Sequence, residues 1–313
     1  MGKNKRKASK GSAIAICILL VLVICSAAVT GYYYKKAKEV RSQLPELQAQ
    51  IKSYEDEYDK LQEENETLQE EYKSASTVPE QIESTKTEVF GLASELEQRI
   101  QNKTTDYKIA YFTFDDGPYY GTYEVLDILK QYDIKATFFT TSINGEYCYD
   151  NSEVASAPIY MEYVKAGHTI ANHTFNHGIR NGLYKSVDSF MEMVDKQEEA
   201  IKEKADGYTA QIVRFPGGSA TAGKLKSGIS EALSAKGYAW VDWTAANGDG
   251  DGTLTEKNAL SNFKKTMGDG IEVILLHDYS SITRANLPAY IEYCNENNYI
   301  CLPLFYDSVA VNK

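Results

Sequence analysis

Short apolar segments alternate with longer amphipathic ones from residue 107 to residue 307, and this alternation leaves few folds open to that part of the chain. The segments that we predict to be strands are residues 109–114, 136–140, 169–172, 212–215, 238–243, 273–276 and 299–302. Helical patterns lie between them, for example at residues 124–131 and 186–204. Parallel strands need a long crossover connection, which is usually a helix. The alternation therefore predicts an α/β domain built on a parallel sheet.

Ionisable side chains stand at or near the ends of several of these predicted strands. Closing the sheet into a barrel would bring five of them to the C-terminal edge of the strands: Asp115, Asp116, His173, Arg214 and His277. Barrel enzymes build their active sites at that edge. The pattern thus predicts a catalytic centre as well as a fold.

A pair of adjacent carboxylates and a pair of imidazoles indicate a metal site. His173 and His177 are four residues apart, so on a helical turn both imidazoles would reach one ion. Two imidazoles and one carboxylate suit Zn²⁺ or Co²⁺ and leave coordination positions open for water and a substrate oxygen. In the pair Asp115-Asp116, one carboxylate can bind the ion while the other takes a proton from the water. The spacing alone does not decide which one does which.

Each of these motifs has a simpler interpretation when taken alone. Asp-Asp-Gly-Pro is typical of a turn, and a lone pair of histidines on a helix is more often solvated or capping than bound to a metal. The chain has only four histidines, however, and two of them stand at ligand spacing downstream of a strand that ends in paired Asp. The joint occurrence favours the metal site.

The stretch from residue 107 to residue 307 resembles the polysaccharide deacetylases, which form carbohydrate esterase family 4 and share the NodB homology domain. The family's first motif, T-F-D-D-G-P, stands without a mismatch at residues 113–118. The second, H-[ST]-x-x-H, is matched at residues 173–177, and the fifth, L-x-H, at residues 275–277. The resemblance implies a distorted (β/α)₇ barrel for this domain.

The resemblance also implies roles for the motif residues. The side chains that would hold one divalent cation, Zn²⁺ first and Co²⁺ or a similar ion second, are Asp116, His173 and His177. Asp115 would be the general base, His277 the general acid and Arg214 the residue that orients the base. His168 is given no chemical role, and we expect it to be structural.

The third and fourth motifs depart from the family pattern. Where many relatives have R-x-P-Y, Gly217 replaces the aromatic residue; its backbone N–H can still serve as an oxyanion donor, but a pocket wall is lost. The fourth motif, D-x-x-D-W in many relatives, has no clean counterpart. We expect Asp242 or Asp249 to pair with Arg214, and Trp243 to line the pocket. Tyrosines that flank Pro118, Tyr119 first among them, are expected to line a sugar-binding cleft.

The implied activity is metal-assisted hydrolysis of N-acetyl groups on an extracellular glycan, with cell-wall peptidoglycan as the preferred substrate. Chitin-like oligomers, an exopolysaccharide and acetylated xylan are alternative substrates. A different interpretation is a catalytically weakened glycan-binding scaffold, in which the altered third and fourth motifs prevent turnover. The intact first, second and fifth motifs favour the enzyme.

An uncharged apolar run near the N-terminus indicates where this chemistry takes place. Residues 13–31 are long enough to cross a bilayer core of about 30 Å, and we predict a transmembrane helix at 13–34 with Tyr32, Tyr33 and Tyr34 at the interface. The basic tail at residues 1–12 favours a cytoplasmic N-terminus and an extracellular catalytic domain. Basic residues also follow the span, so this orientation rests partly on the resemblance. A cleaved signal peptide is the alternative.

Residues 35–101 are predicted to form a helical stalk. Apolar and tyrosine side chains recur at spacings of three and four between residues 44 and 72, which is a heptad seam. Asn65 falls on this seam and would favour a parallel homodimer. Three tyrosines on the seam fit a single solvated helix equally well. Beyond Pro79, residues 80–100 are expected to continue the stalk.

Charge and cysteine content limit the partners of the chain. With 33 basic and 44 acidic residues, the net charge of −11 argues against nucleic acid, which requires a basic surface. Of the five cysteines, three lie outside the predicted span, so they cannot all pair with one another. Buried thiols or a Cys294–Cys301 disulfide are the two interpretations. The catalytic domain is placed at residues 102–313.

Overall fold

The computed structural model describes residues 78–142, 157–252 and 254–313, together with scattered residues between 26 and 60, all of them helical. The chain divides into two compact units, residues 1–79 and residues 80–313. Among the described residues, no helix has both the length and the apolarity that a bilayer crossing needs. The predicted span at 13–34 falls largely outside the described residues, as does much of the predicted heptad seam.

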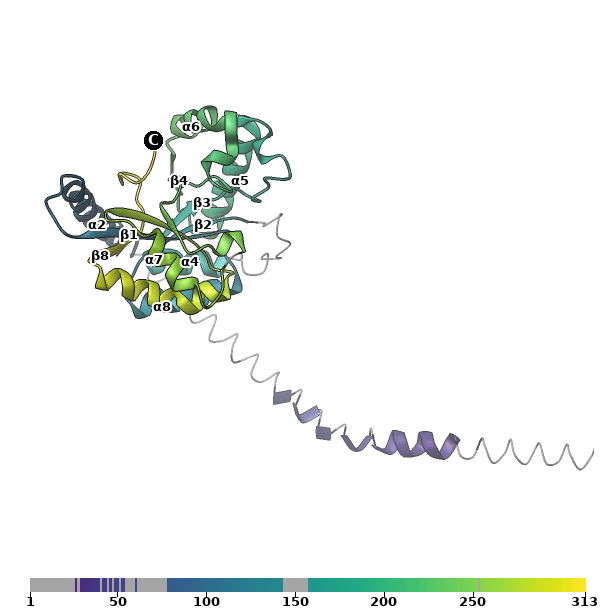
Figure 1. Ribbon diagram of the computed structural model, residues 1–313. Coiled ribbons are helices and arrows are strands. Elements are labelled where there is room, and N and C mark those ends of the chain that lie inside the picture. The colour runs from purple at the N-terminus through teal and green to yellow at the C-terminus, as the bar shows by residue number, and fades with distance from the viewer. Residues whose placement is uncertain are drawn as a thin grey trace, which may run out of the picture. The chain divides into compact units, whose positions relative to one another are not determined.

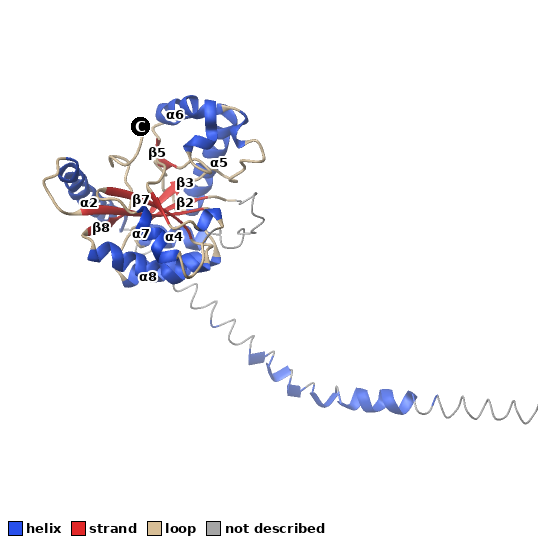
Figure 2. Cartoon of the chain, in the orientation of Figure 1, coloured by secondary structure: helices blue, strands red, loops and turns tan. Residues whose placement is uncertain are grey.

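The second unit is built on one parallel sheet with helices packed against it (Figures 1 and 2). Its strands are β1 (Lys108–Asp115), β2 (Thr137–Thr140), β3 (Thr169–Asn172), β4 (Ile212–Val213), β5 (Ala239–Trp240), β6 (Ala245–Ala246), β7 (Ile271–His277) and β8 (Tyr299–Leu302). The order is β5-β4-β3-β2-β1-β7-β6, and β8 pairs with the first half of β1. No strand pairing joins β5 to β6 among the described residues. The sheet is therefore an incomplete barrel, which agrees with the predicted distorted (β/α)₇ fold.

Helices connect the strands and cover the outer face of the sheet. They are α3 (Tyr120–Gln131), α4 (Ala157–Lys165), α5 (Val187–Lys204), α6 (Lys226–Ala235), α7 (Ala259–Thr266) and α8 (Ser281–Glu296), with short 3₁₀ turns η1 (Leu183–Lys185), η2 (Ser219–Leu225) and η3 (Asp249–Asp251). Local sequence sets two of the starts: the hydroxyls of Ser186 and Ser280 accept the backbone N–H of Ser189 and Thr283 at the starts of α5 and α8. The helix predicted at 186–204 corresponds to α5. The helix predicted at 124–131 corresponds to α3, which starts at Tyr120, before the predicted start.

The segment predicted as one strand at residues 238–243 has a different structure. Its first part forms β5 at one edge of the sheet, and the chain then crosses to the other edge, where β6 pairs with β7. Val241 and Asp242 lie in the crossing, so their carbonyls are not used by the sheet and accept hydrogen bonds from Arg214 instead. The aromatic and apolar composition of the segment does not distinguish a strand from such a crossing.

Strand β1 shows how the sheet divides two cores. Ala110, Phe112 and Phe114 lie in the outer core beneath the helices, whereas Ile109 and Tyr111 lie in an inner core enclosed by the curled sheet. Both sets are buried, which is why the sequence is apolar throughout rather than alternating. Because side chains alternate between the two faces of a strand, Thr113 and Asp115 lie on the same inner side as Ile109 and Tyr111.

Helix α2 (Val78–Gln101) packs against this inner core rather than extending the stalk. Ala93 and Glu97 are buried, and Phe90, Leu96 and Ile100 contact the inner core. The predicted domain boundary at residue 101/102 is therefore corrected: the second unit begins at residue 80.

The error has a physical origin in one buried carboxylate. Leu92 is 64 % exposed, while the buried side of α2 contains Glu97. The Glu97 carboxylate accepts hydrogen bonds from the Tyr111 hydroxyl (2.7 Å), the Ser308 hydroxyl and the Val309 N–H (3.1 Å). A glutamate on a helix is usually solvated, so Glu97 gave no sign in the sequence that this side of the helix is buried.

Candidate active site

The two adjacent aspartates at the end of β1 both line one pocket. Neighbouring residues in a strand point to opposite faces, so a regular strand would separate them. Asp115 follows the inward alternation of β1, but Asp116 has a φ of 71°, outside the strand region. The Thr141 hydroxyl donates to the Asp116 carbonyl at 3.1 Å and fixes this turn. The change of backbone conformation brings both carboxylates to the same side.

The two histidines lie in the loop after β3 and not on a helical turn, which corrects the geometry expected from their spacing. Thr174 and His177 both have positive φ values, 66° and 47°. Asn172 holds the loop by accepting the Thr174 N–H and donating to the Val194 carbonyl. This tight turn, rather than a helix, brings the rings of His173 and His177 to a centroid distance of 5.0 Å.

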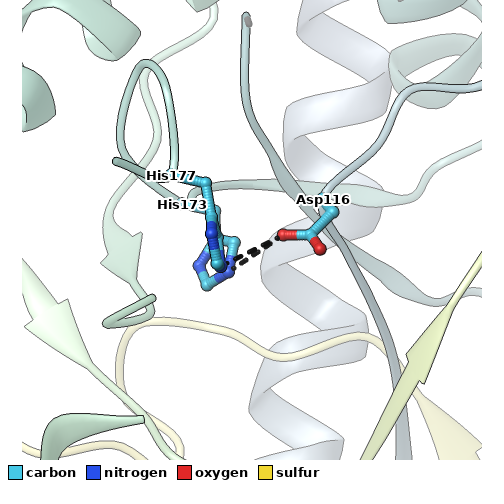
Figure 3. A group of neighbouring side chains, drawn as sticks. All are labelled: Asp116, His173 and His177. Carbon is cyan, nitrogen blue, oxygen red and sulfur yellow. Dashed lines mark ion pairs between the residues drawn. The ribbon is translucent and has the colours of Figure 1, made fainter. Parts of the chain in front are cut away.

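Asp116, His173 and His177 form a buried cluster suited to a metal ion (Figure 3). The Nε2 atoms of both histidines lie 3.4 Å from Asp116 Oδ1, and the three ligand atoms lie within 4.8 Å of one another. Asp116 Oδ1 is buried and makes no hydrogen bond to the described part of the chain. A buried, unsatisfied carboxylate oxygen is costly, and a divalent cation would satisfy it.

His173 is held in the state that a metal ligand needs. Its Nδ1 lies 2.8 Å from the Arg214 carbonyl, so this nitrogen carries the proton and Nε2 presents its lone pair to the cluster. Burial, with the neighbouring charge of His177, lowers the pKa of His173 well below its usual value. A neutral imidazole is the form that binds metals.

Asp115 forms a buried ion pair with Arg214, at 2.8 Å between Oδ1 and Nη1. The guanidinium also donates to the Thr113 hydroxyl and to the carbonyls of Val241 and Asp242, and it lies 4.0 Å from the centre of the Phe139 ring. Burial raises the pKa of Asp115 above its usual value, although Arg214 opposes the change. Asp115 is therefore a stronger proton acceptor than an exposed carboxylate and is fixed in position.

His277, at the end of β7, faces the cluster from the other side of the pocket. Its Nε2 lies 3.9 Å from Asp116 Oδ2, and its Nδ1 lies 2.7 Å from Asp249 Oδ1. Burial alone would lower the pKa of His277, but the Asp249 carboxylate and its hydrogen bond, with the charges of Asp116 and Asp115, raise it to about 9. The ring is thus a protonated donor at neutral pH.

The carboxylates of the fourth motif do not have the role predicted for them. Asp249 pairs with His277, and its second oxygen accepts from the His277 N–H and the Thr283 hydroxyl. Asp242 contacts Arg214 only through its backbone carbonyl, while its carboxylate accepts from the N–H and hydroxyl of Ser219. Among the described residues, the carboxylate that pairs with Arg214 is Asp115, as predicted, whereas the carboxylates of Asp242 and Asp249 have other partners, contrary to expectation.

The pocket around these groups has a volume of about 320 Å³. Trp243 lines it, as expected, and Gly217 lines it as well. Tyr119 is not among the lining residues; its ring packs edge-on against Tyr279, with centroids 5.6 Å apart, and Tyr279 lines the pocket in its place. The sequence analysis missed Tyr279, although its position two residues after His277 offered a signal. The oxyanion role of the Gly217 N–H stays a prediction.

Other polar groups lie outside this pocket. His168 is buried, accepts the Ala136 N–H at Nδ1, and has a pKa lowered by burial to about 3, as suits a structural residue. Cys294 and Cys301 are both free thiols; Cys148 falls outside the described residues. A larger pocket of about 640 Å³ lies beside α2, where β3 and β4 begin, and holds none of the catalytic side chains.

Comparison with known proteins supports the interpretation drawn from the geometry. Residues 102–234 match the family model for polysaccharide deacetylase. A peptidoglycan-N-acetylglucosamine deacetylase of Bacillus cereus is 30% identical over 240 residues, which cover 71% of this chain and 81% of that protein. The chain belongs to the polysaccharide deacetylase family.

Solved structures of polysaccharide deacetylases share the fold. The catalytic domain of peptidoglycan N-acetylglucosamine deacetylase from Eubacterium rectale superposes with a TM-score of 0.57 at 29% identity, covering 66% of this chain and 92% of that one. The polysaccharide deacetylase Bc1974 from Bacillus cereus gives a TM-score of 0.55 at 27% identity, covering 64% and 94%. The family assignment therefore rests on both sequence and structure.

The Asp249–His277 pair of this deacetylase predicts a pH dependence. If His277 is the general acid, as the sequence analysis predicts, it must be protonated to act, and activity should fall as the pH rises through its pKa. Asp249→Asn removes the charge that raises this pKa, so the alkaline limb of the kcat/KM profile should move to lower pH by about one unit or more. A profile measured from pH 6 to 10 tests this, with Asp242→Asn as a matched control. An unchanged alkaline limb would contradict the pairing.

Proposed function

We propose that this deacetylase removes N-acetyl groups from amino sugars of cell-wall peptidoglycan and uses one divalent cation, Zn²⁺ in the first place. One observation carries the proposal. A single pocket holds the cluster of Asp116, His173 and His177, and this cluster lies between two charged pairs, Asp115–Arg214 and His277–Asp249. The Bacillus cereus relative, whose name states a peptidoglycan substrate, supports the choice of glycan.

Each residue of the site has a separate role in the proposed amide hydrolysis. A divalent cation held by Asp116, His173 and His177 would polarise the acetamide carbonyl and increase the acidity of a water molecule. Asp115, held by Arg214, takes a proton from the attacking water as the C–O bond forms. His277, held by Asp249, donates its Nε2 proton to the amine nitrogen as the C–N bond breaks. The products are acetate and a free amino sugar.

Chitin-like oligomers are the second candidate substrate. A chitin deacetylase from Colletotrichum lindemuthianum is 31% identical over 182 residues, which cover 56% of this chain and 68% of that protein. Its substrate, as its name states it, carries the same N-acetylated sugar chemistry. Acetylated xylan would require an ester rather than an amide to be cleaved, and exopolysaccharide has no observation in its favour.

An acetate-release assay across purified peptidoglycan, chitooligosaccharide and acetylxylan tests the proposal. We expect the fastest release from peptidoglycan, loss of activity after chelation, and recovery when Zn²⁺ or Co²⁺ is added back. Chelation removes the group that polarises the carbonyl, so the loss should exceed about 100-fold. Absence of release from every substrate in the presence of metal would favour the scaffold interpretation instead.

We further propose that residues 13–34 cross the cell membrane, with residues 1–12 in the cytoplasm and the catalytic unit outside. The uncharged run and the basic tail before it support this placement. Treating intact cells with a protease should remove the catalytic unit while a cytoplasmic marker survives. Protection of the catalytic unit would reverse the proposed orientation.

A further inference from the structure

One side chain on the buried stripe of α5 is an uncharged amide. Phe190, Val194, Gln197 and Ile201 follow one another at helical spacing, and all four are fully buried. Three of them are apolar, as expected of a helix that packs against a sheet. Burying an amide is costly unless it is hydrogen-bonded, whereas an apolar side chain of similar size would pack without that cost. The position of Gln197 therefore directs attention to the contacts that its amide makes.

The amide of Gln197 bonds to two hydroxyls at the end of β2. Its Nε2 donates to the Thr140 hydroxyl at 3.0 Å, and its Oε1 accepts from the Ser142 hydroxyl at 2.8 Å. Thr140 and Ser142 are both buried. The amide thus spans residues 140–142, which we call the bridging segment, and fixes this segment to α5.

The bridging segment bonds on one side to the turn that carries Asp116. The N–H of Thr141 donates to the Gly117 carbonyl at 2.9 Å, and the Thr141 hydroxyl donates to the Asp116 carbonyl at 3.1 Å. These two contacts hold the backbone of Asp116 in its positive-φ conformation. The position of the Asp116 carboxylate therefore depends on that of the bridging segment.

The same segment bonds on its other side to the loop that carries the two histidines. The carbonyl of Thr140 accepts the His173 N–H, and the N–H of Ser142 donates to the Phe175 carbonyl, both at 3.0 Å. Phe175 in turn donates its own N–H to the Met193 carbonyl of α5 at 3.0 Å. The loop, the bridging segment and α5 thus form a closed set of contacts, and a shift of the bridging segment would move the histidines relative to Asp116.

We propose that Gln197 is a positioning residue for the metal site. By holding the bridging segment against α5, it sets the separation of Asp116 from His173 and His177 (Figure 3). The inference rests on the proposed function in one respect, namely that these three side chains bind a divalent cation. Gln197 is uncharged, so its replacement by an apolar residue of similar size changes the geometry of the ligands and not the charge around the ion. Groups that hold metal ligands in place typically contribute about 10- to 100-fold to metal affinity.

A Zn²⁺ titration of the full-length protein, read by competition with a colorimetric chelator, tests the proposal. Gln197→Met keeps the size of the side chain and removes both hydrogen bonds, so we expect the Kd for Zn²⁺ to rise about tenfold. Ser142→Ala removes one of the same bonds from the other end. The double variant should bind Zn²⁺ no more weakly than Gln197→Met alone, because the two substitutions break a shared contact.

Ile201→Val is the matched control for a loss of stability alone. It shortens a fully buried side chain one turn further along the same stripe, where it leaves the bridging segment untouched. We expect Tm to fall, because the substitution leaves a cavity, while the Kd for Zn²⁺ stays within about twofold of the parent value.

Hydrogen exchange of the metal-free protein measures how the histidine loop is held, independently of the ion. The N–H groups of His173 and Phe175 bond to Thr140 and to Met193. Their exchange should be about tenfold faster in Gln197→Met than in the parent protein, and unchanged in Ile201→Val.

A tenfold rise in Kd together with faster exchange would support the inference. An unchanged Kd and unchanged exchange in folded Gln197→Met protein would overturn it, even if the parent enzyme releases acetate normally. If Gln197→Met does not fold, Ser142→Ala decides the question by the same two measurements. If the parent protein binds no Zn²⁺, the proposed metal site fails, and the exchange rates still decide whether Gln197 holds the histidine loop.

Discussion

Replacement of Asp115 by asparagine should slow acetate release by about 10²- to 10⁴-fold, the range expected for loss of a general base. The amide cannot take a proton, yet it has nearly the same size and keeps an oxygen that can accept from Arg214. Because the three predicted metal ligands are untouched, the variant should still bind one divalent ion per chain. Kinetics with peptidoglycan and metal analysis after dialysis measure the two properties separately.

The main risk to this experiment is the buried charge that the substitution leaves behind. Arg214 is fully buried, and removing a charged partner from a buried pair is often strongly destabilising. The guanidinium keeps its bonds to Thr113 and to the carbonyls of Val241 and Asp242, so we expect the fold to survive. Thermal unfolding checks this, and Asp127→Asn, at an exposed position of α3, is the matched control. Full activity in a folded Asp115→Asn protein would remove Asp115 from the mechanism.

The sequence predicted which side chains meet in the candidate site because they lie in two short motifs and at one strand end. A motif fixes residues that are close along the chain, and the ends of parallel strands meet at one edge of the sheet. Asp115, Asp116, His173, His177 and His277 all line the single pocket expected of them. The helical spacing of the histidines was a coincidence, since a loop with positive φ angles brings them together.

The fourth motif could not be resolved in the same way. Asp242 lies in the segment that crosses from one sheet edge to the other between β5 and β6, and Asp249 lies just beyond β6, at the start of η3. Periodicity contains no information on such a crossing. The crossing turns the carbonyl of Asp242 toward Arg214, and the pairing of β6 with β7 beyond it brings the carboxylate of Asp249 beside His277. The pairing of Asp115 with Arg214 and of Asp249 with His277 is a property of the tertiary structure, because the two members of each pair are far apart in the sequence.

Helix α2 is the element that the sequence misplaced most, and the correction has a large consequence for stability. A fragment of residues 78–313 should fold, whereas a fragment of residues 102–313 should not, because removing α2 exposes the inner core to water. The exposed set would include Tyr111 and Phe305, and Phe305 would lose its stacked contact with Phe90. Circular dichroism and cooperative thermal unfolding of the two fragments distinguish these outcomes. Equal stability of the two fragments would show that the catalytic unit does not need α2, as expected if the helix belonged to the stalk.

A single substitution in the full-length chain tests the same contact more finely. Glu97→Ala leaves the hydroxyls of Tyr111 and Ser308 and the N–H of Val309 without their acceptor, at a cost of about 2–4 kcal/mol in the free energy of unfolding. That cost corresponds to a fall in Tm of roughly 5–15 °C for a domain of this size. Glu97→Gln keeps an accepting oxygen and should lose less. Glu95→Ala, on the exposed side of the same helix, should change Tm little. If Glu95→Ala and Glu97→Ala have the same Tm, then Glu97 does not hold α2 against the inner core, and the helix is stabilised by its apolar contacts alone.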